Sequence, residues 1–582
     1  MSLTSDQRTK YCELFEKYPV AISHMRQQFM VQRLGLVLGA GIGNHLKFPS
    51  WKQLVEKIAK TPEVDGECLL VDDIKKQRSV TSQMLYQLFK DKYLSIPNGR
   101  TEYEKFGDIE LRKRWKELVQ SVLYDGVSDK PDEWIAACPY MKQLINVIRK
   151  SGTMTVTYNF DDTIERLLHV HNSERGSRGY TVVWDTNVQA EKRGNIVYHP
   201  NGYLPRNKGE FTSQQLVFLE DTFEDQLIDS FSGHYNALHN HYSSKTCLFL
   251  GISLEDRTLK HMLHRNAKKC YGHMHYIVQY LKNHDNDALM EEFMRAETEA
   301  NFDTYNLFTM YLTSEEINTL MELLQLEKLD YEEVCLDIPK TRKFFITGAV
   351  AAGKSTTFNQ FKSFLTFDEW LEEMPSKMEL APSGIKEDEE KAIDNWIAVQ
   401  INRKNTNLID KTNLYQPCIA IIDRAPSDAY SFFTDINDLI SPETPGAETE
   451  KEVRLKKLSN LWKAKAKLHL SKLSRGSILT GGKIIFLEGE ICEMEKRAKQ
   501  KFREYTARDL KIQQEELHYI AEGAKKLSGK DDSVAFVNVT NKTIEQVTKE
   551  VAEIIFFDEY QEVDFQDILL SIKEKGRSFY EA

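Results

Sequence analysis

The chain has 582 residues, 41% of them hydrophobic and 28% charged, which is typical of globular proteins and excludes long disordered or low-complexity tracts. The formal net charge of −11 at pH 7 argues against a protein whose main role is to coat nucleic acid, and we do not expect direct nucleic-acid binding. A chain of this length exceeds what one hydrophobic core supports, so we expect more than one domain.

The cysteines and the N-terminal residues indicate the compartment. The eight cysteines lie far apart and none forms a Cys-x-x-Cys pair, so neither a zinc ribbon nor a disulfide framework is predicted. The first residues show no basic and apolar signal sequence, and no apolar run approaches the roughly 20 residues needed to cross a bilayer. We therefore expect a cytoplasmic protein with reduced cysteines and no membrane contact.

The first motif is a glycine-rich turn between a strand and a helix. Residues 34–38 predict a buried strand, residues 39–43 (Gly-Ala-Gly-Ile-Gly) follow, and Ser50 precedes an amphipathic helix. This order lets a backbone approach a pyrophosphate closely, although glycines after a strand also serve tight turns alone. A dehydrogenase is not predicted, because Asn44 occupies the third glycine position of the Rossmann fingerprint and the acidic candidate Glu56 lies inside the helix.

Three later strands are predicted to end in polar or glycine-containing turns. The predicted strands and the turns that follow them are 153–157 with 158–162, 195–198 with 199–202, and 246–250 with 251–256. Because α/β folds place their chemistry at the carboxyl ends of parallel strands, we expect these turns and the first glycine loop to form one site.

These turns resemble the motifs of sirtuins in the same order, and in particular the sirtuin-like NADase module of bacterial anti-phage proteins, over roughly residues 30–285. The resemblance implies that the first loop holds the pyrophosphate and ribose of NAD+, that Asn159 and Asp161 lie at the nicotinamide ribose, and that Ser253 contacts the adenosine half. The NAD-binding residues implied are Gly39, Ala40, Gly41, Gly202, Gly251, Ser253 and Asp256. Protein-deacetylating sirtuins carry a four-cysteine zinc module that this chain lacks, so the resemblance implies hydrolysis of NAD+ to ADP-ribose and nicotinamide.

One position departs from the family pattern. The usual histidine lies directly before the turn glycine, but Asn201 precedes Gly202 here, and His199 lies two residues earlier on the same face of an extended segment. Either His199 acts as the base from a shifted place, or cleavage is impaired, by nature or by substitution, while binding is kept. We favour impaired cleavage, because asparagine forms hydrogen bonds but cannot act as a base. The catalytic candidates are Asn159, Asp161, His199 and Asn201.

The second glycine loop, residues 348–356, matches G-x-x-x-x-G-K-[ST] in full and follows an apolar strand at 344–347. In this motif backbone amides hold phosphates, Lys354 reaches the β and γ oxygens, and the Ser355 hydroxyl ligates Mg²⁺. A further strand at 418–422 is predicted to deliver an acidic residue as a second ligand. The predicted nucleotide-binding residues are Gly348, Gly353, Lys354, Ser355, Thr356, Asp423 and Arg424, with Mg²⁺ held by Ser355 and Asp423.

The C-terminal landmarks resemble the deoxynucleoside and thymidylate kinase group, which implies ATP or dNTP/dNMP as ligands. Asp423-Arg424-Ala425 stands where that group has an acidic-Arg-Ser motif, and Phe367 to Trp370 would supply the carboxylate that takes a proton from a sugar hydroxyl. Trp396 and Gln400 would lie on the base-recognising helix. A basic helix at 496–503, with Arg497, Lys501 and Arg503, resembles the phosphate-clamping lid, although a solvated face explains such a helix equally well.

We therefore predict an α/β protein with two doubly wound domains, a Rossmann-like sirtuin domain and a P-loop nucleoside-kinase-like domain. The expected division is a helical extension at 1–30, an NAD-binding domain at 31–335 and a kinase-like domain at 340–582, with an insertion at 428–478 of unreadable function. This organisation implies an anti-phage effector in which the second domain controls NAD+ hydrolysis, with small-molecule nucleotides as ligands, a homo-oligomeric state and a phage-derived trigger. The alternatives are a sensor that only binds its ligands and a nucleoside kinase that NAD+ regulates.

Overall fold

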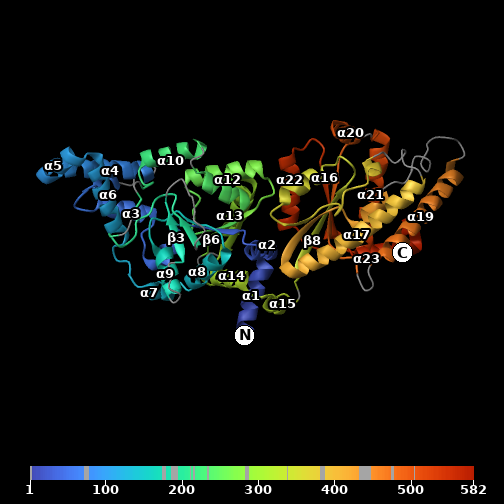
Figure 1. Cartoon of the computed structure of the whole chain (residues 1–582), viewed down its shortest axis with the longest axis horizontal. Helices are drawn as coiled ribbons and strands as arrows, with labels where there is room; N and C mark the ends of the chain where they lie inside the picture. Colours follow the sequence, from blue (N-terminus) through green and yellow to red (C-terminus); the bar gives the residue numbers. More distant parts are fainter. Residues whose placement is uncertain are drawn as a thin grey trace. The chain divides into compact units, whose positions relative to one another are not determined.

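The structure is a computed structural model, and it describes part of the chain. The described residues are 3–70, 78–173, 179–184, 195–209, 212–213, 216–232, 235–281, 288–336, 338–379, 387–431, 447–473, 478–501, 503 and 505–581. The chain forms two compact units (Figure 1). Unit 1 comprises Met1–Tyr18, Gln28–Cys270 and Met274–Glu327, and unit 2 comprises Pro19–Gln27, Tyr271–His273 and Lys328–Ala582.

Unit 1 is built on a seven-stranded sheet with the order β3-β4-β2-β1-β5-β6-β7, and every pairing in it is parallel. Its strands are β1 (Leu34–Leu38), β2 (Thr155–Thr157), β3 (Tyr180–Val183), β4 (Asn195–Tyr198), β5 (Thr246–Leu250), β6 (His275–Tyr280) and β7 (Leu307–Leu312). The central strands β1 and β5 are buried along their whole length. Their continuous apolar runs are what a parallel sheet covered on both faces requires.

Helices connect these strands and cover the sheet, with α8 packed on β1, α11 on β5, and α13 and α14 on β7. Most of the helices lie wholly in unit 1: α1 (Ser5–Lys17), α3 (Trp51–Ala59), α4 (Arg78–Ser95), α5 (Pro97–Phe106), α6 (Asp108–Leu123), α7 (Pro131–Ala137), α8 (Tyr140–Ser151), α9 (Thr163–Ser173), α10 (Glu220–Ser232), α11 (Asn236–Ser244), α12 (Arg257–Lys269), α13 (Ala288–Tyr305) and α14 (Ser314–Gln325). Helix α2 (Pro19–Met30) begins in the segment 19–27 that belongs to unit 2.

Unit 2 is built on a five-stranded parallel sheet with the order β12-β11-β8-β10-β9. Its strands are β8 (Thr341–Gly348), β9 (Leu365–Phe367), β10 (Cys418–Asp423), β11 (Lys483–Glu488) and β12 (Val534–Asn538). Its helices are α15 (Lys328–Val334), α16 (Lys354–Phe358), α17 (Glu387–Tyr415), α19 (Ala447–Lys472), α20 (Ile491–Gln500), α21 (Ala507–Ser528), α22 (Ile544–Phe556) and α23 (Phe565–Lys575). The predicted insertion at 428–478 contains α19, and residues 432–446 and 474–477 lie outside the described part of the chain.

Both sheets change winding direction next to the strand that carries the glycine loop. In unit 1 the chain leaves β1 toward β2 on one side, whereas it leaves the neighbouring β5 toward β6 on the other side. In unit 2 the chain leaves β8 toward β9, whereas it leaves the neighbouring β11 toward β12. A parallel sheet opens a crevice at the carboxyl ends of two such strands, and ligands bind there. Topology therefore places each glycine loop at such a crevice.

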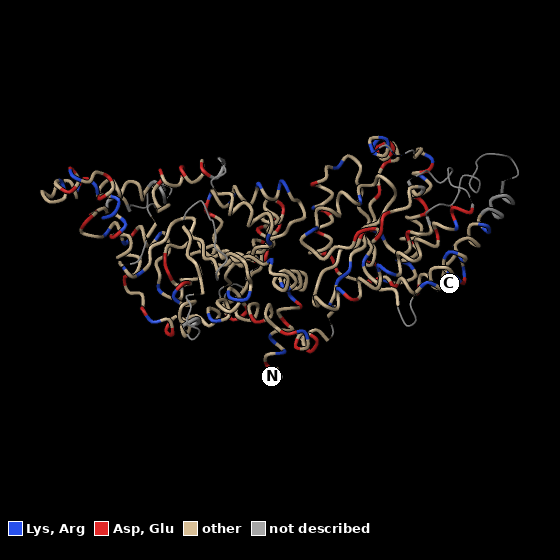
Figure 2. Tube along the Cα trace, viewed as in Figure 1, with Lys and Arg blue, Asp and Glu red and all other residues tan. Residues whose placement is uncertain are grey.

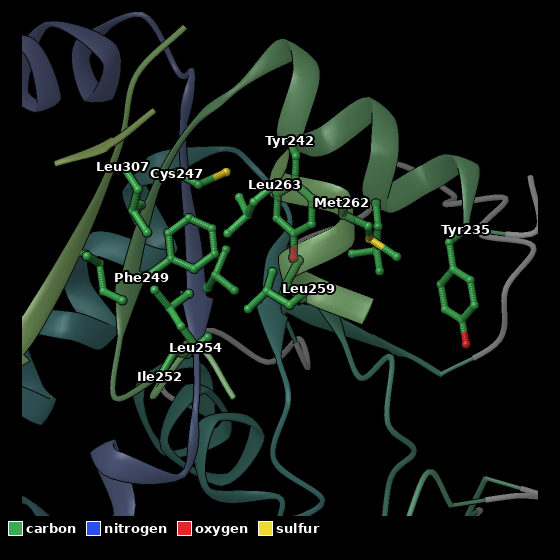
Figure 3. Close-up of a cluster of buried hydrophobic side chains, with 14 of the residues drawn as sticks. Tyr235, Tyr242, Cys247, Phe249, Ile252, Leu254, Leu259, Met262, Leu263 and Leu307 are labelled. Atoms are coloured by element: carbon green, nitrogen blue, oxygen red, sulfur yellow. The ribbon is translucent and has the colours of Figure 1, made fainter. Parts of the chain in front are cut away.

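A buried apolar cluster in unit 1 packs around β5 (Figure 3). It joins Phe249 of β5 to Tyr242 of α11 and Leu263 of α12, and it includes Ile252 and Leu254 from the loop after β5. The loop is therefore anchored on its inner side by hydrophobic burial.

The fold class is confirmed, because the protein is an α/β protein with two parallel sheets consistent with Rossmann-like units. The predicted strands at 34–38 and 246–250 match β1 and β5. The predicted strand at 153–157 is shorter, because the Thr153 hydroxyl donates a hydrogen bond to the Leu34 carbonyl and pairing begins at Thr155. None of the helices in the described part of the chain has the length and hydropathy needed to cross a membrane.

Candidate functional site

Three glycines bring the ends of β1 and β5 into backbone contact. The amide of Gly39 donates to the Leu250 carbonyl at 2.9 Å, and the amide of Gly41 donates to the Gly251 carbonyl at 2.9 Å. A Cβ added at Gly39 would lie 2.5 Å from the Gly251 carbonyl oxygen, and one added at Gly41 would lie 2.7 Å from the Gly251 Cα. Contacts this short do not occur, so the close approach of the two loops requires glycine. Ala40 follows Gly39 as the first residue of a 3₁₀ turn.

Asn159 and Asn201 approach the same crevice from two further strand ends. Asn159 follows β2, and its Nδ2 donates to the Gly39 carbonyl at 3.2 Å. Asn201 follows β4, its Oδ1 accepts from Gln226 Nε2 at 3.1 Å, and its Nδ2 donates to the Tyr158 carbonyl at 3.4 Å. The chain itself therefore fixes the orientation of both carboxamides.

A pocket of about 560 Å³ lies between these strand ends. Ligand pockets of proteins span roughly 300–1,000 Å³, so this pocket is large enough for a ligand such as a dinucleotide. Seven predicted residues line the pocket, namely Gly39, Ala40, Asn159, Asn201, Gly251, Ser253 and Asp256. Its apolar floor is formed by Ile252, Leu254 and Leu259, which belong to the cluster of Figure 3.

The pocket also contains residues that sequence reasoning did not assign to it, notably Trp51, Tyr158, Phe223, Glu224 and Arg257. Trp51 could have been found, because it is the first residue of α3, the helix that follows the glycine loop. Phe223 and Glu224 lie on α10, which no motif marks, and they reach the pocket only through tertiary packing. Glu224 Oε1 and Arg257 Nη1 are 3.7 Å apart, so an acidic and a basic side chain meet in the lining.

Asp256 serves the local fold as well as the pocket. It is the N-cap of α12, and its Oδ1 accepts the Leu259 amide at 2.8 Å. Burial raises the pKa of the Asp256 carboxyl, and hydrogen bonds from the cap amides and from Asn201 oppose that shift. Ser253 is exposed in the loop before it. The carboxylate therefore touches Asn201 inside the pocket while it holds the helix end.

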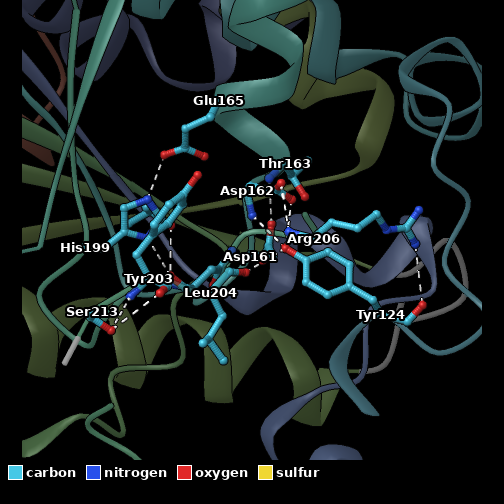
Figure 4. Close-up of polar contacts among 12 residues, drawn as sticks. Tyr124, Asp161, Asp162, Thr163, Glu165, His199, Tyr203, Leu204, Arg206 and Ser213 are labelled. Atoms are coloured by element: carbon cyan, nitrogen blue, oxygen red, sulfur yellow. Dashed lines mark hydrogen bonds and ion pairs between the residues drawn. The ribbon is translucent and has the colours of Figure 1, made fainter. Parts of the chain in front are cut away.

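His199, Asp161 and Gly202 lie outside the described pocket lining. His199 is fully buried, with Nε2 2.7 Å from Glu165 Oε1 and Nδ1 2.9 Å from the Asn159 carbonyl oxygen (Figure 4). Asp161 Oδ1 accepts the Thr163 amide at 3.0 Å, and burial raises the pKa of Asp161 to about 6. Gly202 has φ +107°, a conformation that favours glycine, so this turn explains its presence.

In unit 2 the phosphate-loop motif lies between β8 and α16. Gly348 has φ +141° and Gly353 has φ +95°, both in the region that favours glycine. Lys354 is buried, and its Nζ donates to the Ala349 carbonyl at 2.7 Å. Burial and the nearby Arg424 guanidinium lower the pKa of Lys354. Three nearby carboxylates raise it, but by less. Ser355 and Thr356 follow on α16, which contacts β10.

Helix α21 forms a hydrogen bond with the phosphate loop. No pattern in the sequence predicted this contact. The Val350 amide donates to Gln513 Oε1 at 2.8 Å, and Gln513 is buried. One backbone amide of the loop is thus occupied by the chain.

Asp423 and Arg424 lie in a buried cluster of charged side chains. Arg424 forms ion pairs with Glu369, from the segment after β9, and with Asp428. Lys404 of α17, which sequence reasoning did not assign, donates to the Asp423 carbonyl at 2.5 Å. Asp423 Oδ1 is buried and has no hydrogen-bond partner among the described residues. The motifs at 367–370 and 423–425, distant in sequence, therefore meet at one edge of the sheet.

The basic segment differs from the predicted helix at 496–503. Helix α20 ends one residue before Lys501, because the chain turns there toward Thr506, the N-cap of α21. Arg497 pairs with Glu493 of the same helix at 3.1 Å, and α20 carries both signs of charge (Figure 2). Lys501 and Arg503 are exposed beyond the helix end.

The predicted base-recognising helix is α17. Gln400 is buried, its Nε2 donates to Glu372 Oε2 at 2.8 Å, and its Oε1 accepts the Leu371 amide at 3.3 Å. The Trp396 ring packs on Trp370, with centroids 5.0 Å apart. The chain itself therefore occupies both polar ends of the Gln400 side chain.

In the part of the chain that the structure describes, no group of three or more His, Cys, Asp and Glu side chains could hold a metal ion. Mg²⁺ in nucleotide sites is usually held by one or two protein ligands together with phosphates and water, which requires no such group. The Ser355 hydroxyl and the unpartnered Asp423 Oδ1 have the oxygen chemistry that Mg²⁺ prefers.

Comparison with known proteins bears on unit 1. Residues 153–304 match the family model of a SIR2-like domain. No curated protein matches the chain. The matched range includes Asn159, Asn201 and Ser253 but begins after the first glycine loop. Residues 153–304 therefore form a SIR2-like module, which is compatible with NAD-related activity in the broad sense and with NAD+ as substrate or ligand.

Proposed function

We propose that unit 1 binds NAD+ in the pocket at the ends of β1, β2, β4 and β5 and hydrolyses it to ADP-ribose and nicotinamide. The observation that carries this proposal is the pocket of about 560 Å³ into which both Asn159 and Asn201 are held. Gly39 and Gly251 line this pocket, and because neither has a side chain they allow a pyrophosphate to approach the wall closely. Arg257 supplies a positive charge in the lining that complements the same group.

The chemistry this site can supply is mainly positioning. Asn159 orients the ribose hydroxyls or an attacking water, and the apolar floor excludes bulk solvent from the developing oxocarbenium charge. Residue 201 provides an amide where a base is needed, so binding is retained and cleavage is slow.

We further propose that unit 2 binds a nucleotide, ATP or a dNTP or dNMP, through the phosphate loop, with Mg²⁺ held by Ser355 and Asp423, and that this binding controls unit 1 in an anti-phage role. The observations in support are the left-handed glycines of the loop, the buried Lys354 and the unpartnered Asp423 oxygen. The second candidate is a nucleoside kinase or sensor with NAD+ as regulator. The ion pair of Glu369 with Arg424 favours it, because a carboxylate at that place could accept a sugar hydroxyl proton.

The decisive experiment measures NAD+ loss and nicotinamide release by the full chain against a panel of nucleotides. Asn159→Ala is expected to lower cleavage at least about 100-fold while the thermal unfolding profile stays unchanged, because it removes a positioning group from a strand end. Asn201→His is expected to raise cleavage, since it adds a base with a pKa near about 6.5 beside Asp256. Unchanged turnover in Asn159→Ala would remove the assignment of this site, and phosphoryl transfer to nucleosides without NAD+ loss would favour the second candidate.

A further inference from the structure

With an ionised Glu165, the contacts of His199 are those of a ring that carries a proton on both nitrogens. Nδ1 lies 2.9 Å from the carbonyl oxygen of Asn159, which can only accept a hydrogen bond. Nε2 lies 2.7 Å from Oε1 of Glu165, and an ionised carboxylate likewise only accepts. A neutral imidazole has one N–H and cannot donate to both partners. The ring that fits these contacts is the imidazolium.

The surroundings of His199 favour the same charge state. Burial alone lowers the pKa of His199, but the Glu165 carboxylate, the Asn159 carbonyl and the Asp161 carboxylate outweigh it and raise the pKa. The Tyr203 ring lies 4.8 Å from the imidazole between centroids, where an aromatic face stabilises a cation. Glu165 Oε2 is buried and has no hydrogen-bond partner among the described residues, so the imidazolium is the main stabilising contact of this carboxylate.

The Nδ1 side of the imidazole contacts Asn159, the residue whose carboxamide lines the pocket. Asn159 receives the His199 hydrogen bond on its carbonyl, its amide donates to Thr157 Oγ1 at 3.3 Å, and its Nδ2 donates to the Gly39 carbonyl at 3.2 Å. Glu165 lies on α9, His199 follows β4 and Gly39 follows β1, so one chain of contacts links three parts of the crevice. Figure 4 shows the imidazole between Glu165 and the segment that carries Asp161 and Asp162.

We infer that Glu165 and His199 form a buried ion pair whose role is to fix the Asn159 carboxamide in the pocket, so that His199 is a positioning residue and not the base of the reaction. An imidazolium whose two N–H groups are both engaged has no lone pair with which to take a proton from a hydroxyl or water. Its place outside the pocket lining agrees with this role. The inference rests on the proposed binding of NAD+ by unit 1.

Two substitutions at one position separate positioning from base catalysis. His199→Leu removes the hydrogen bond to the Asn159 carbonyl, whereas His199→Asn retains an amide donor close to the place of Nδ1 but can never act as a base. NAD+ affinity is measured by calorimetry on the full chain, and cleavage by nicotinamide release. We expect His199→Leu to weaken NAD+ binding about three- to tenfold, the usual effect of losing one hydrogen bond, and His199→Asn to keep most of the affinity and the cleavage. Loss of cleavage in both variants with unchanged affinity would overturn the inference.

Tyr124→Phe is the matched control for stability. Its hydroxyl donates to Asp162 Oδ1 at 2.7 Å near the start of α9, and its other hydrogen-bond partners among the described residues are the Leu204 carbonyl and the Asp162 amide, not Asn159. An equal loss of NAD+ affinity in Tyr124→Phe and His199→Leu would mean that the ion pair only stabilises the fold in general. That result would overturn the inference.

The charge state is tested without NAD+. Glu165→Gln removes the charge while its amide can still donate to a neutral imidazole, so this variant folds even if His199→Leu does not. Nitrogen NMR of labelled histidine should show two protonated ring nitrogens for His199 in the parent protein above neutral pH and one in Glu165→Gln. A single protonated nitrogen in the parent would overturn the inference. A parent protein that shows both protons but binds no NAD+ would remove the proposed function, and the role of the pair with it.

Discussion

The two glycine loops of the protein look alike in the sequence, but Gly39 of the first and Gly353 of the second need glycine for different physical reasons. In unit 1 a Cβ at Gly39 would meet the Gly251 carbonyl oxygen at 2.5 Å, yet Gly39 itself has an ordinary extended backbone. In unit 2 a Cβ at Gly353 would meet nothing within 4 Å, and the residue is glycine because its φ is +95°. Gly39 is therefore required by the close approach of two backbones and Gly353 by its own conformation, whereas Gly348 of the second loop meets both demands, because its φ is +141° and an added Cβ would lie 2.3 Å from the Leu487 carbonyl oxygen.

This difference indicates what each loop does. Two loops packed backbone to backbone form a wall that a flat, extended ligand can lie against, as in a pocket at a topological switch point. A loop with successive unusual backbone angles turns its amides toward one centre, as a bound phosphate group requires. The number of glycines in a loop does not distinguish a pocket wall from a phosphate-binding loop. The physical reason why a given position needs glycine does distinguish them.

The strongest test of the comparison replaces one glycine that meets both demands and one that meets only the backbone demand with alanine. Gly251 combines both demands, since it has φ +68° and a Cβ there would lie 2.5 Å from the Ile42 amide nitrogen. We expect Gly251→Ala to destabilise the protein by about 3–5 kcal/mol and to abolish NAD+ binding. Gly353→Ala meets only the backbone penalty, about 1–3 kcal/mol. Calorimetric unfolding of the full chain measures both, and equal losses would break the distinction between the loops.

A smaller effect is expected from the charged residue of the second loop. Lys354→Ala should weaken nucleotide binding about 10- to 100-fold, because it removes a charge-assisted contact to phosphate oxygens. If unit 2 controls unit 1, linkage requires that NAD+ also shifts nucleotide affinity, typically by ~1–3 kcal/mol. The measurement is nucleotide affinity with and without saturating NAD+, in the parent and in Asn159→Ala. Affinities that agree within error would mean that the two units merely share a chain.

The smallest expected effect concerns pH and the buried carboxyl of Asp161, outside the pocket lining. Burial raises the pKa of Asp161 to about 6, above the about 3.9 of an exposed aspartate, so the folded state binds more protons between these values. Stability is therefore lost as the pH rises from about 4 to 6. Asp161→Asn keeps an oxygen that accepts the Thr163 amide and should raise stability by about 1–3 kcal/mol at pH 7.5, with no gain near pH 4.

Asp162→Asn is the control for this prediction. Both oxygens of Asp162 accept hydrogen bonds, from the Tyr124 hydroxyl and from the Arg206 amide, so one amide nitrogen there must lose a contact. A loss of stability in Asp162→Asn together with a gain in Asp161→Asn is the expected pattern. Stabilisation by both variants would assign the effect to overall charge.

Local patterns in the sequence predicted the local parts of this protein well. The apolar runs of β1 and β5 and the Ser50 cap of α3 depend on residues close in sequence, and they were predicted with their bounds. The predicted basic helix was too long. It was predicted from the spacing of positive charges, and that spacing does not show that Thr506 caps a new helix.

Contacts made by tertiary packing could not be predicted. Gln226 reaches Asn201 from α10, Gln513 reaches the phosphate loop from α21, and Lys404 reaches the Asp423 carbonyl from α17. Each is a polar residue on a long helix with no motif around it, and its role depends on how that helix lies on the sheet. The same holds for Glu165, which looks like an ordinary surface residue of an amphipathic helix until its partner at 199 is placed.

The segment 19–27, which belongs to unit 2 although it lies near the N-terminus, has a consequence for the order of synthesis. His24 stacks on Phe364 with ring centroids 4.0 Å apart, and its Nε2 lies 3.1 Å from the Ser363 carbonyl, 339 residues further along the chain. At roughly 5–20 residues per second, the ribosome makes this partner about 20–70 s after His24. A fragment that starts at residue 328 would lack the segment altogether. Unit 2 is thus the later unit to fold on the ribosome, and His24 in its first segment cannot make these contacts until residues 363 and 364 have emerged.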